Sequence, residues 1–128
     1  MKNILGIGTD IVEISRIKNL FIKNKKFKYR IFSLKEIKYC ESKVNKIASY
    51  SKRFAAKEAF AKALGVGISK GISFKEISIT NNKNGAPFIQ LLGKTKIIAE
   101  KLTKNKNKIY LTLSDEKKYA LATVVISY

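Results

Sequence analysis

The N-terminal apolar run from Ile4 to Val12 combines two glycines with one carboxylate. Its length and its β-branched residues predict a strand, and period-two alternation places Gly6, Gly8 and Asp10 on one face. Glycine weakens a strand, and the usual compensation is a bulge or the close approach of another backbone or a ligand. Two interpretations follow. In the first, the glycines allow a helix to pack closely against the strand, and Asp10 only ends the strand. In the second, Asp10 lies beside an open space that could hold a metal or a phosphate ester.

The chain has 128 residues, of which 45% are hydrophobic, and this predicts one domain over residues 1–128 with a buried core. Its 27 basic and 9 acidic side chains give a formal net charge of +18. That charge predicts an anionic partner, whether nucleic acid, a membrane surface, an acidic protein or a phosphorylated substrate. With no histidine and a single cysteine, Cys40, the chain lacks the ligands of the usual zinc sites. Any metal would therefore be hard and bound by oxygen.

The N-terminal run resembles neither a signal peptide nor a membrane span, because Asp10 and Glu13 interrupt it. We therefore expect a cytoplasmic protein with no membrane partner. Lysine supplies most of the basic residues and is scattered along the chain, which is typical of a solvated surface. Arg16, Arg30 and Arg53 instead indicate positions where a planar, bidentate donor serves better than a point charge.

The order of the predicted elements indicates the fold class. Helices are expected at 15–24, from Ser33 to about Ser42, from Val44 or Ser49 to Leu64, and at 94–102. Strands are expected at 77–80 and 86–92, around the turn-forming residues 81–85, and in a terminal hairpin of 109–113 and 120–126. Helices grouped early and strands grouped late predict an α+β domain, with a mostly antiparallel sheet packed against helices.

The third of these helices carries charged residues at a spacing that suits phosphate chemistry. Phe54, Glu58 and Lys62 are four residues apart and lie opposite an alanine-rich face, and Gly65 is expected to end the helix. Taken alone, Glu58 and Lys62 are a favourable ion pair on a helix surface. With Asp10 they gain a second interpretation, because Mg²⁺ in phosphate chemistry takes one or two carboxylates and leaves its other positions to phosphates and water. Asp10 and Glu58 would bind the metal, and the positively charged ammonium of Lys62 would point toward the same phosphates.

Four segments make the chain similar to a known family. They are Gly6–Glu13 with Arg16, Arg53–Gly65, Asn84–Pro87 and Tyr119–Ala122. In these segments, and in its length and order of elements, the chain resembles the bacterial holo-acyl-carrier-protein synthases, which are short, single-domain phosphopantetheinyl transferases. The resemblance implies transfer of the 4′-phosphopantetheine arm of coenzyme A to a serine of apo-acyl carrier protein in fatty acid biosynthesis, releasing adenosine 3′,5′-bisphosphate. It also implies the phosphopantetheinyl transferase fold and a homotrimer with active sites at subunit boundaries.

The resemblance assigns roles to individual residues. It implies Mg²⁺ at Asp10 and Glu58, and a Lys62 that stabilises the departing phosphate. Either Glu58 or a metal-bound water would accept the serine proton. Arg16 is implied to dock the acidic carrier protein, with Lys23 adding electrostatic steering. The residues implied to bind coenzyme A are Arg53, Lys57, Lys62, Gly65, Asn84, Gly85 and Pro87.

One position departs from the family pattern. Many members have a histidine near the terminal hairpin turn, where this chain has Asp115. If that histidine helps to bind a phosphate of coenzyme A, Asp115 would repel the phosphate. We therefore expect a nearby lysine to compensate for the acidic side chain.

The alternative function is a small basic RNA-binding module, whose lysines would bind phosphates without chemistry. The aromatic pattern counts against it, because Tyr and Phe fall mainly at core spacing and no predicted strand carries paired aromatics for base stacking. We therefore expect no nucleic-acid partner. Dependence on a metal would distinguish the two functions.

Overall fold

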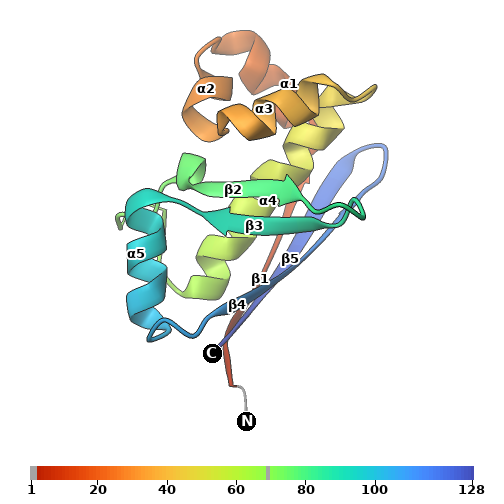
Figure 1. The fold of residues 1–128 in the computed structure, drawn as a ribbon. Coiled ribbons are helices and arrows are strands. Elements are labelled where there is room, and N and C mark those ends of the chain that lie inside the picture. The colour runs from red at the N-terminus through yellow and green to blue at the C-terminus, as the bar shows by residue number, and fades with distance from the viewer. Residues whose placement is uncertain (1–2, 69) are drawn as a thin grey trace.

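The computed structural model describes residues 3–68 and 70–128 (Figure 1). Its elements follow the predicted order, with α2 and the short 3₁₀ helix η1 added. They are β1 (Ile4–Glu13), α1 (Ile14–Lys23), α2 (Phe27–Ile31), α3 (Leu34–Glu41), α4 (Lys46–Leu64), η1 (Phe74–Glu76), β2 (Ile77–Asn81), β3 (Pro87–Leu91), α5 (Gly93–Leu102), β4 (Lys108–Asp115) and β5 (Tyr119–Ser127). None of the helices in these described residues is long and apolar enough to cross a membrane.

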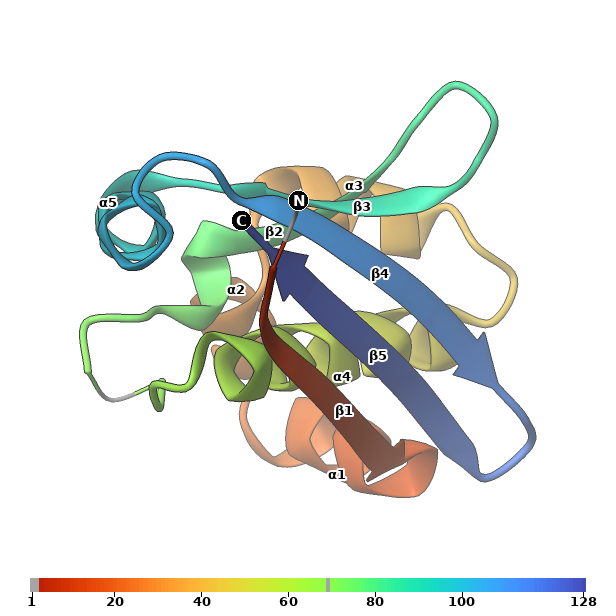
Figure 2. The ribbon, with the colours of Figure 1, turned by 90° about the horizontal axis from the view of Figure 1, so that it is seen from below.

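The described strands form two antiparallel sheets. β1, β5 and β4 are neighbours in that order, and β2 pairs with β3 in a hairpin that contacts β4. Figure 2 shows the three-stranded sheet lying across α4. Asp10 is paired with Ala122 and Gly8 with Val124. The predicted α+β class, with antiparallel strands packed against helices, is confirmed.

α4 is the central helix of the core. It contacts β1 and β5 on one side and α1, α3 and β2 on others, so that 14 of its 19 residues are buried all around the helix. The side of α4 opposite the alanine-rich face is therefore exposed to solvent over only part of its length. Phe54 on that side is 8% exposed, because it packs against Phe27 and Phe74 with ring centroids 6.3 and 5.5 Å away. Glu58 and Lys62, further along, remain accessible.

Local signals set the start of α3 and the end of α4. The Ser33 side chain accepts a hydrogen bond from the Glu36 backbone, and the Glu36 carboxylate accepts one from the Ser33 backbone at 2.9 Å, which is the predicted capping box. Gly65 ends α4 in the left-handed conformation, with φ 83°. The sequence analysis did not predict α2. This five-residue helix has no side-chain cap at Lys26 and depends on aromatic packing at its first residue, Phe27.

The two glycines of β1 lie directly beneath α4. A methyl group on Gly8 would lie 1.9 Å from the carbonyl oxygen of Ala59, and one on Gly6 would lie 1.8 Å from that of Ala63. The first interpretation of the N-terminal run is therefore right for the glycines, which admit a packed helix. The expectation of an open space over the glycines beside Asp10 is wrong, because the backbone of α4 fills that space.

We expect Gly8→Ala to lower the free energy of unfolding by about 1–3 kcal/mol, the usual cost of forcing a group into a filled core. The neighbouring atom belongs to the backbone of Ala59, so the strain cannot be relieved by turning a side chain. Urea denaturation followed by circular dichroism measures the change. A variant as stable as the parent protein would show that α4 and β1 do not make this contact.

Candidate functional site

β1 and α4 bring together charged side chains that are far apart in the sequence. Lys62 Nζ donates hydrogen bonds to Asp10 Oδ1 at 3.1 Å and to the Thr9 carbonyl oxygen at 3.0 Å. Glu58 lies one helical turn before Lys62 and is close enough to Asp10 for the two carboxylates to repel each other. The structure thus places the two predicted acids and the predicted lysine at one site.

The close contact between β1 and α4 explains this proximity. Asp10 follows Gly8 on the same face of β1, at the edge of the contact that the glycine makes. Glu58 directly precedes Ala59, whose carbonyl oxygen lies over Gly8. The contact between β1 and α4 therefore sets the backbone positions of Asp10 and Glu58 relative to each other.

Asp10 and Glu58 form an acid pair. The pKa of Glu58 in this pair is raised from its ordinary value of 4.5. Burial is the largest cause and the Asp10 carboxylate adds to it, whereas the charges of Lys62 and Arg16 lower the pKa. Arg16 comes from α1, so a third element contributes to the charge balance. The site holds two carboxylates beside two cations, and Glu58 is partly withdrawn from water.

The carboxylates of Asp10 and Glu58 suit a hard divalent cation. Both offer oxygen ligands, and a further positive charge between them would relieve the repulsion that raises the pKa of Glu58. Within residues 3–68 and 70–128, no group of three His, Cys, Asp or Glu side chains could hold a metal by itself. Mg²⁺ bound by this pair would therefore complete its coordination with water or phosphate oxygens.

A hollow of about 360 Å³ opens beside the charged residues of α4. The residues that line it are Glu58, Ala61, Lys62, Gly65, Val66, Gly67 and Ile68. Gly65 has open space where a side chain would be, so a ligand could approach its backbone. Gly65, Glu58 and Lys62, which the sequence analysis assigned to coenzyme A binding and catalysis, therefore share one wall.

The other residues assigned to coenzyme A form a second group around the β2–β3 turn. Arg53 donates to Asn81 Oδ1 at 3.0 Å, and Asn81 Nδ2 donates to the Gly85 carbonyl oxygen at 2.9 Å. Asn84 lies in the same turn, and Pro87 is the first residue of β3. Arg53 and Glu58 are five residues apart and point about 140° apart around α4. The two groups thus face different sides of the helix, and contact between the 2% exposed Arg53 and a phosphate stays a prediction.

Lys57 does not lie at either group. Its side chain is 0% exposed, and its Nζ donates to Glu36 Oε1 at 2.7 Å and to the carbonyl oxygens of Phe74 and Ile77. The prediction that Lys57 binds coenzyme A is wrong, because its ammonium is buried and all three of its N–H groups have partners. No sequence pattern indicates that Lys57 is buried in an ion pair, since the acid that pairs with it is 21 residues away.

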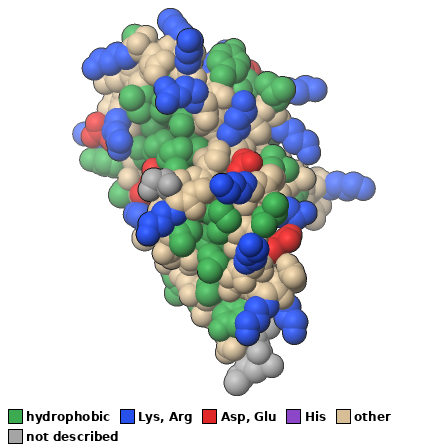
Figure 3. All heavy atoms as spheres, turned by 90° about the vertical axis from the view of Figure 1, so that its left-hand side faces the viewer, with side chains coloured by type: hydrophobic (Ala, Val, Ile, Leu, Met, Phe, Trp, Pro, Cys, Tyr) green, Lys and Arg blue, Asp and Glu red, His purple; other side chains and the backbone are tan. Residues whose placement is uncertain are grey.

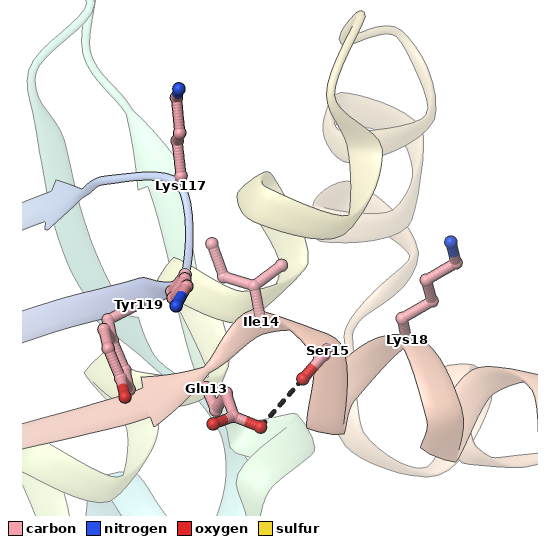
Figure 4. Close-up of a pocket in the computed structure, with 7 residues that line it drawn as sticks. Glu13, Ile14, Ser15, Lys18, Lys117 and Tyr119 are labelled. Atoms are coloured by element: carbon pink, nitrogen blue, oxygen red, sulfur yellow. Dashed lines mark hydrogen bonds between the residues drawn. The ribbon is translucent and has the colours of Figure 1, made fainter.

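A larger hollow of about 480 Å³ lies between the start of α1 and the β4–β5 turn (Figure 4). Its described lining residues are Glu13, Ile14, Ser15, Lys18, Lys117, Lys118 and Tyr119, which the sequence analysis did not single out as a group. The Ser15 hydroxyl donates to Glu13 Oε1 at 2.8 Å, so this carboxylate is engaged within the wall. Asp10, Glu58 and Lys62 are not among these lining residues, whereas Glu58 and Lys62 both line the smaller hollow. The lysines instead extend the basic surface of α1.

The residues predicted to dock a carrier protein form an exposed line on α1. Arg16 and Lys23 are seven residues apart, so they point within about 20° of each other. Both are exposed. Arg16 lies at the end of α1 near Glu58, and Lys23 lies at the far end. The line therefore leads away from the acid pair.

Asp115, which departs from the family pattern, has a basic partner. Lys52 Nζ lies 3.2 Å from Asp115 Oδ1. The expectation that a nearby lysine compensates for this acid is supported by the pair. Lys52 directly precedes Arg53, so the pair belongs to the same end of α4 as the second group.

Comparisons with known proteins agree with the geometry. The profile of the 4′-phosphopantetheinyl transferase superfamily matches residues 6–124. A holo-[acyl-carrier-protein] synthase of Pelagibacter ubique is 46% identical over 124 residues, which cover 96% of each chain. The crystal structure of such a synthase from Neisseria meningitidis is 37% identical, with a TM-score of 0.88 over 97% of this chain and 98% of that one. The Helicobacter pylori synthase, in complex with coenzyme A, is 34% identical, with a TM-score of 0.80 over 94% and 98%.

We expect Glu58→Gln to raise the melting temperature at pH 7. Because the pKa of Glu58 is raised on folding, the folded protein binds this proton more tightly than the unfolded chain. Stability therefore falls as the pH rises from the ordinary value of 4.5 through the folded pKa. The neutral amide removes this loss, so the difference should vanish at about pH 4 and below. Thermal denaturation across this range tests it, and a variant less stable than the parent at pH 7 would contradict the raised pKa.

Proposed function

Because the chain belongs to the 4′-phosphopantetheinyl transferase superfamily, among the holo-[acyl-carrier-protein] synthases, we propose that it transfers the 4′-phosphopantetheine arm of coenzyme A to a serine of apo-acyl carrier protein. The proposed reaction depends on Mg²⁺, releases adenosine 3′,5′-bisphosphate and serves fatty acid biosynthesis in the cytoplasm. The observation that carries the proposal is the meeting of Asp10, Glu58 and Lys62 beside an open hollow.

The residues of the site match the charge that develops in this reaction. Attack of the serine hydroxyl on the β-phosphorus of coenzyme A moves negative charge onto the leaving adenosine bisphosphate. Asp10 and Glu58 would hold Mg²⁺, which when bound supplies positive charge to the phosphoryl oxygens. The Lys62 side chain is 56% exposed and lines the hollow, so its ammonium can reach a phosphate there. At that place it would stabilise the departing group.

The serine must lose its proton as the new phosphorus–oxygen bond forms. The raised pKa of Glu58 brings its basicity closer to neutral pH than that of an ordinary carboxylate. We propose that Glu58 accepts the proton, either directly or through one water. Its opening to the hollow gives the incoming hydroxyl a path to this carboxylate.

We propose that the active protein is a homotrimer in which two subunits complete each site. The acid pair and the group around Arg53 face different sides of α4, so another subunit would have to bring the second group to the same coenzyme A. The sheet face away from α4 offers a contact surface. On it Ile7, Ile11 and Leu121 are 67%, 63% and 39% exposed, and Ile11 pairs directly with Leu121. Burying these side chains against another copy would stabilise the assembly.

We propose that the basic surface of α1 docks the acidic carrier protein. The line of Arg16 and Lys23 lies beside the lysine-lined hollow of Figure 4. Figure 3 shows that, on the face at the left of Figure 1, basic side chains are many and acidic side chains are few, so the positive charge is not confined to α1. Such a surface attracts and orients an acidic partner. Since the charge of Arg16 acts on Glu58, a partner docked at Arg16 would have its serine close to the acid pair.

The RNA-binding alternative has less support. Phe21, Phe27, Phe32 and Tyr50 pack against one another in or against the core, so these rings do not offer faces for base stacking. An RNA binder that depends on lysine should also be indifferent to the loss of the Asp10 carboxylate. Variants of the acid pair therefore separate the two functions.

Mass spectrometry tests the proposed reaction directly. Incubation of apo-acyl carrier protein with this protein, coenzyme A and Mg²⁺ should add one phosphopantetheine group, and a chelator should prevent the addition. We expect Asp10→Asn and Glu58→Gln each to lower kcat about 100-fold or more, because each removes a charge from the reacting centre. Glu100→Gln is a matched control in an exposed pair with Lys96 on α5, and it should leave kcat unchanged. Absence of the adduct with the parent protein would contradict the proposal.

We expect Arg16→Glu to raise the KM for the carrier protein about tenfold or more, because it reverses a charge at the docking surface. The KM for coenzyme A should change little. Lys23→Glu lies at the far end of α1, away from Glu58, and should raise the same KM without lowering kcat. Steady-state kinetics with each substrate varied measures these effects. Equal changes in both KM values would show that α1 does not dock the carrier protein.

A further inference from the structure

Lys57 lies in one of the four segments that resemble the family, yet it takes no part in the proposed reaction. Its ammonium is completely buried and has three partners in three different elements. They are Glu36 Oε1 of α3, at 2.7 Å, the Phe74 carbonyl oxygen of η1, at 2.8 Å, and the Ile77 carbonyl oxygen of β2. One side chain of α4 thus joins the helix to three segments on the side away from the three-stranded sheet.

The partner carboxylate is equally well satisfied. Glu36 Oε1 also accepts from the Ser33 backbone at 2.9 Å, and Glu36 Oε2 accepts from the Ile79 backbone at 3.1 Å. Glu36 is 0% exposed. Its hydrogen bonds fix the start of α3 and the middle of β2 to the same point. The pair is therefore a junction of α3, η1, β2 and α4.

A second buried cation on the same side of α4 extends the junction. Arg53 lies about one turn before Lys57, so the two side chains point within about 40° of each other. Lys57 bonds the first residue of β2, Ile77, and Arg53 bonds the last, Asn81. Together they hold both ends of one strand to one face of the helix. That strand leads into the turn assigned to coenzyme A.

Stability alone is a weak reason for such a pair. Removing two charges from water is costly, and well-packed apolar residues often replace a buried ion pair without loss of stability. What a fully hydrogen-bonded pair does provide is a fixed direction, since each N–H and each carboxylate oxygen requires its partner at one place. The relevant question is therefore which part of the molecule the pair holds in position.

We propose that Glu36 and Lys57 are positioning residues, whose buried pair fixes the rotation of α4 and so places the Glu58 carboxylate beside Asp10. This inference rests on the proposed function, which assigns Glu58 to the reaction. Lys57 and Glu58 are adjacent and point about 100° apart, so the first anchors the helix while the second faces the site. Ala59, which contacts β1, lies about 200° from Lys57. The two contacts hold α4 from nearly opposite sides.

The test compares two variants of the full-length protein. Lys57→Met leaves the Glu36 carboxylate buried without a cation, and we expect it to be strongly destabilised. Glu36→Gln combined with Lys57→Met removes both charges and should recover part of the lost stability, because no unpaired charge stays buried. In this double variant we expect kcat to remain about tenfold or more below the parent, with an unchanged KM for the carrier protein. The backbone amide NMR signals of Asp10 and Ala59 should be displaced.

A control variant separates positioning from general destabilisation. The Glu76 carboxylate accepts hydrogen bonds from Thr95 N, Thr95 Oγ1 and Lys94 N, and thus joins η1 to α5. Glu76→Gln disrupts a carboxylate hydrogen-bond network whose partners lie on α5 rather than α4. We expect it to lower stability while leaving kcat and the amide signals of Asp10 and Ala59 unchanged.

The outcomes distinguish this inference from the proposed function. If kcat returns to the parent value together with stability in the double variant, the positioning role is overturned. Undisplaced amide signals of Asp10 and Ala59 in the double variant would also overturn it, whatever the activity. A parent protein that does not modify the carrier protein would contradict the proposed function, and the amide signals would still decide whether the pair positions α4.

Discussion

The contact between the backbone of α4 and the two glycines of β1 is the constraint on which the site depends. Gly6 and Gly8 leave room for carbonyl oxygens of the helix, so strand and helix approach more closely than side chains would permit. The close approach places Asp10 at the edge of the contact. There Lys62 donates a hydrogen bond to the Asp10 carboxylate, and the charge of Asp10 repels the Glu58 carboxylate. Burial raises the pKa of Glu58 and the nearby charge of Asp10 adds to the effect. The affinity expected for a hard cation also follows from the proximity of the two acids.

The features that could be predicted from the sequence have local causes. Ser33 and Glu36 form a capping box within one turn, and Gly65 ends α4 because it adopts a left-handed conformation readily. Alternation along β1 correctly placed Gly8 and Asp10 on one face. The meeting of the two acids is a long-range contact that no local pattern contains. Its prediction rests on the carboxylate ligands that Mg²⁺ takes in phosphate chemistry and on the family resemblance.

The features that could not be predicted depend on what the tertiary structure places beside a residue. Lys57 and Lys62 both lie in one alanine-rich helix, and nothing nearby in the sequence shows that the first is buried on Glu36 while the second is exposed. Helix α2 has no capping signal and forms because the ring of Phe27 packs into an aromatic cluster. Periodicity identified α4 but not its central place, because elements from both halves of the chain cover it.

The close approach of β1 and α4 makes the two sides of that interface unequal in the substitutions that they tolerate. On the helix side the contacting atoms include the carbonyl oxygens of Ala59 and Ala63, which every amino acid possesses. On the strand side the contact requires that a β-carbon be missing at positions 6 and 8, and glycine alone meets that condition. The carbonyl oxygens that α4 presents to β1 would therefore be present whatever side chains the helix carried, whereas any side chain at position 6 or 8 would push strand and helix apart.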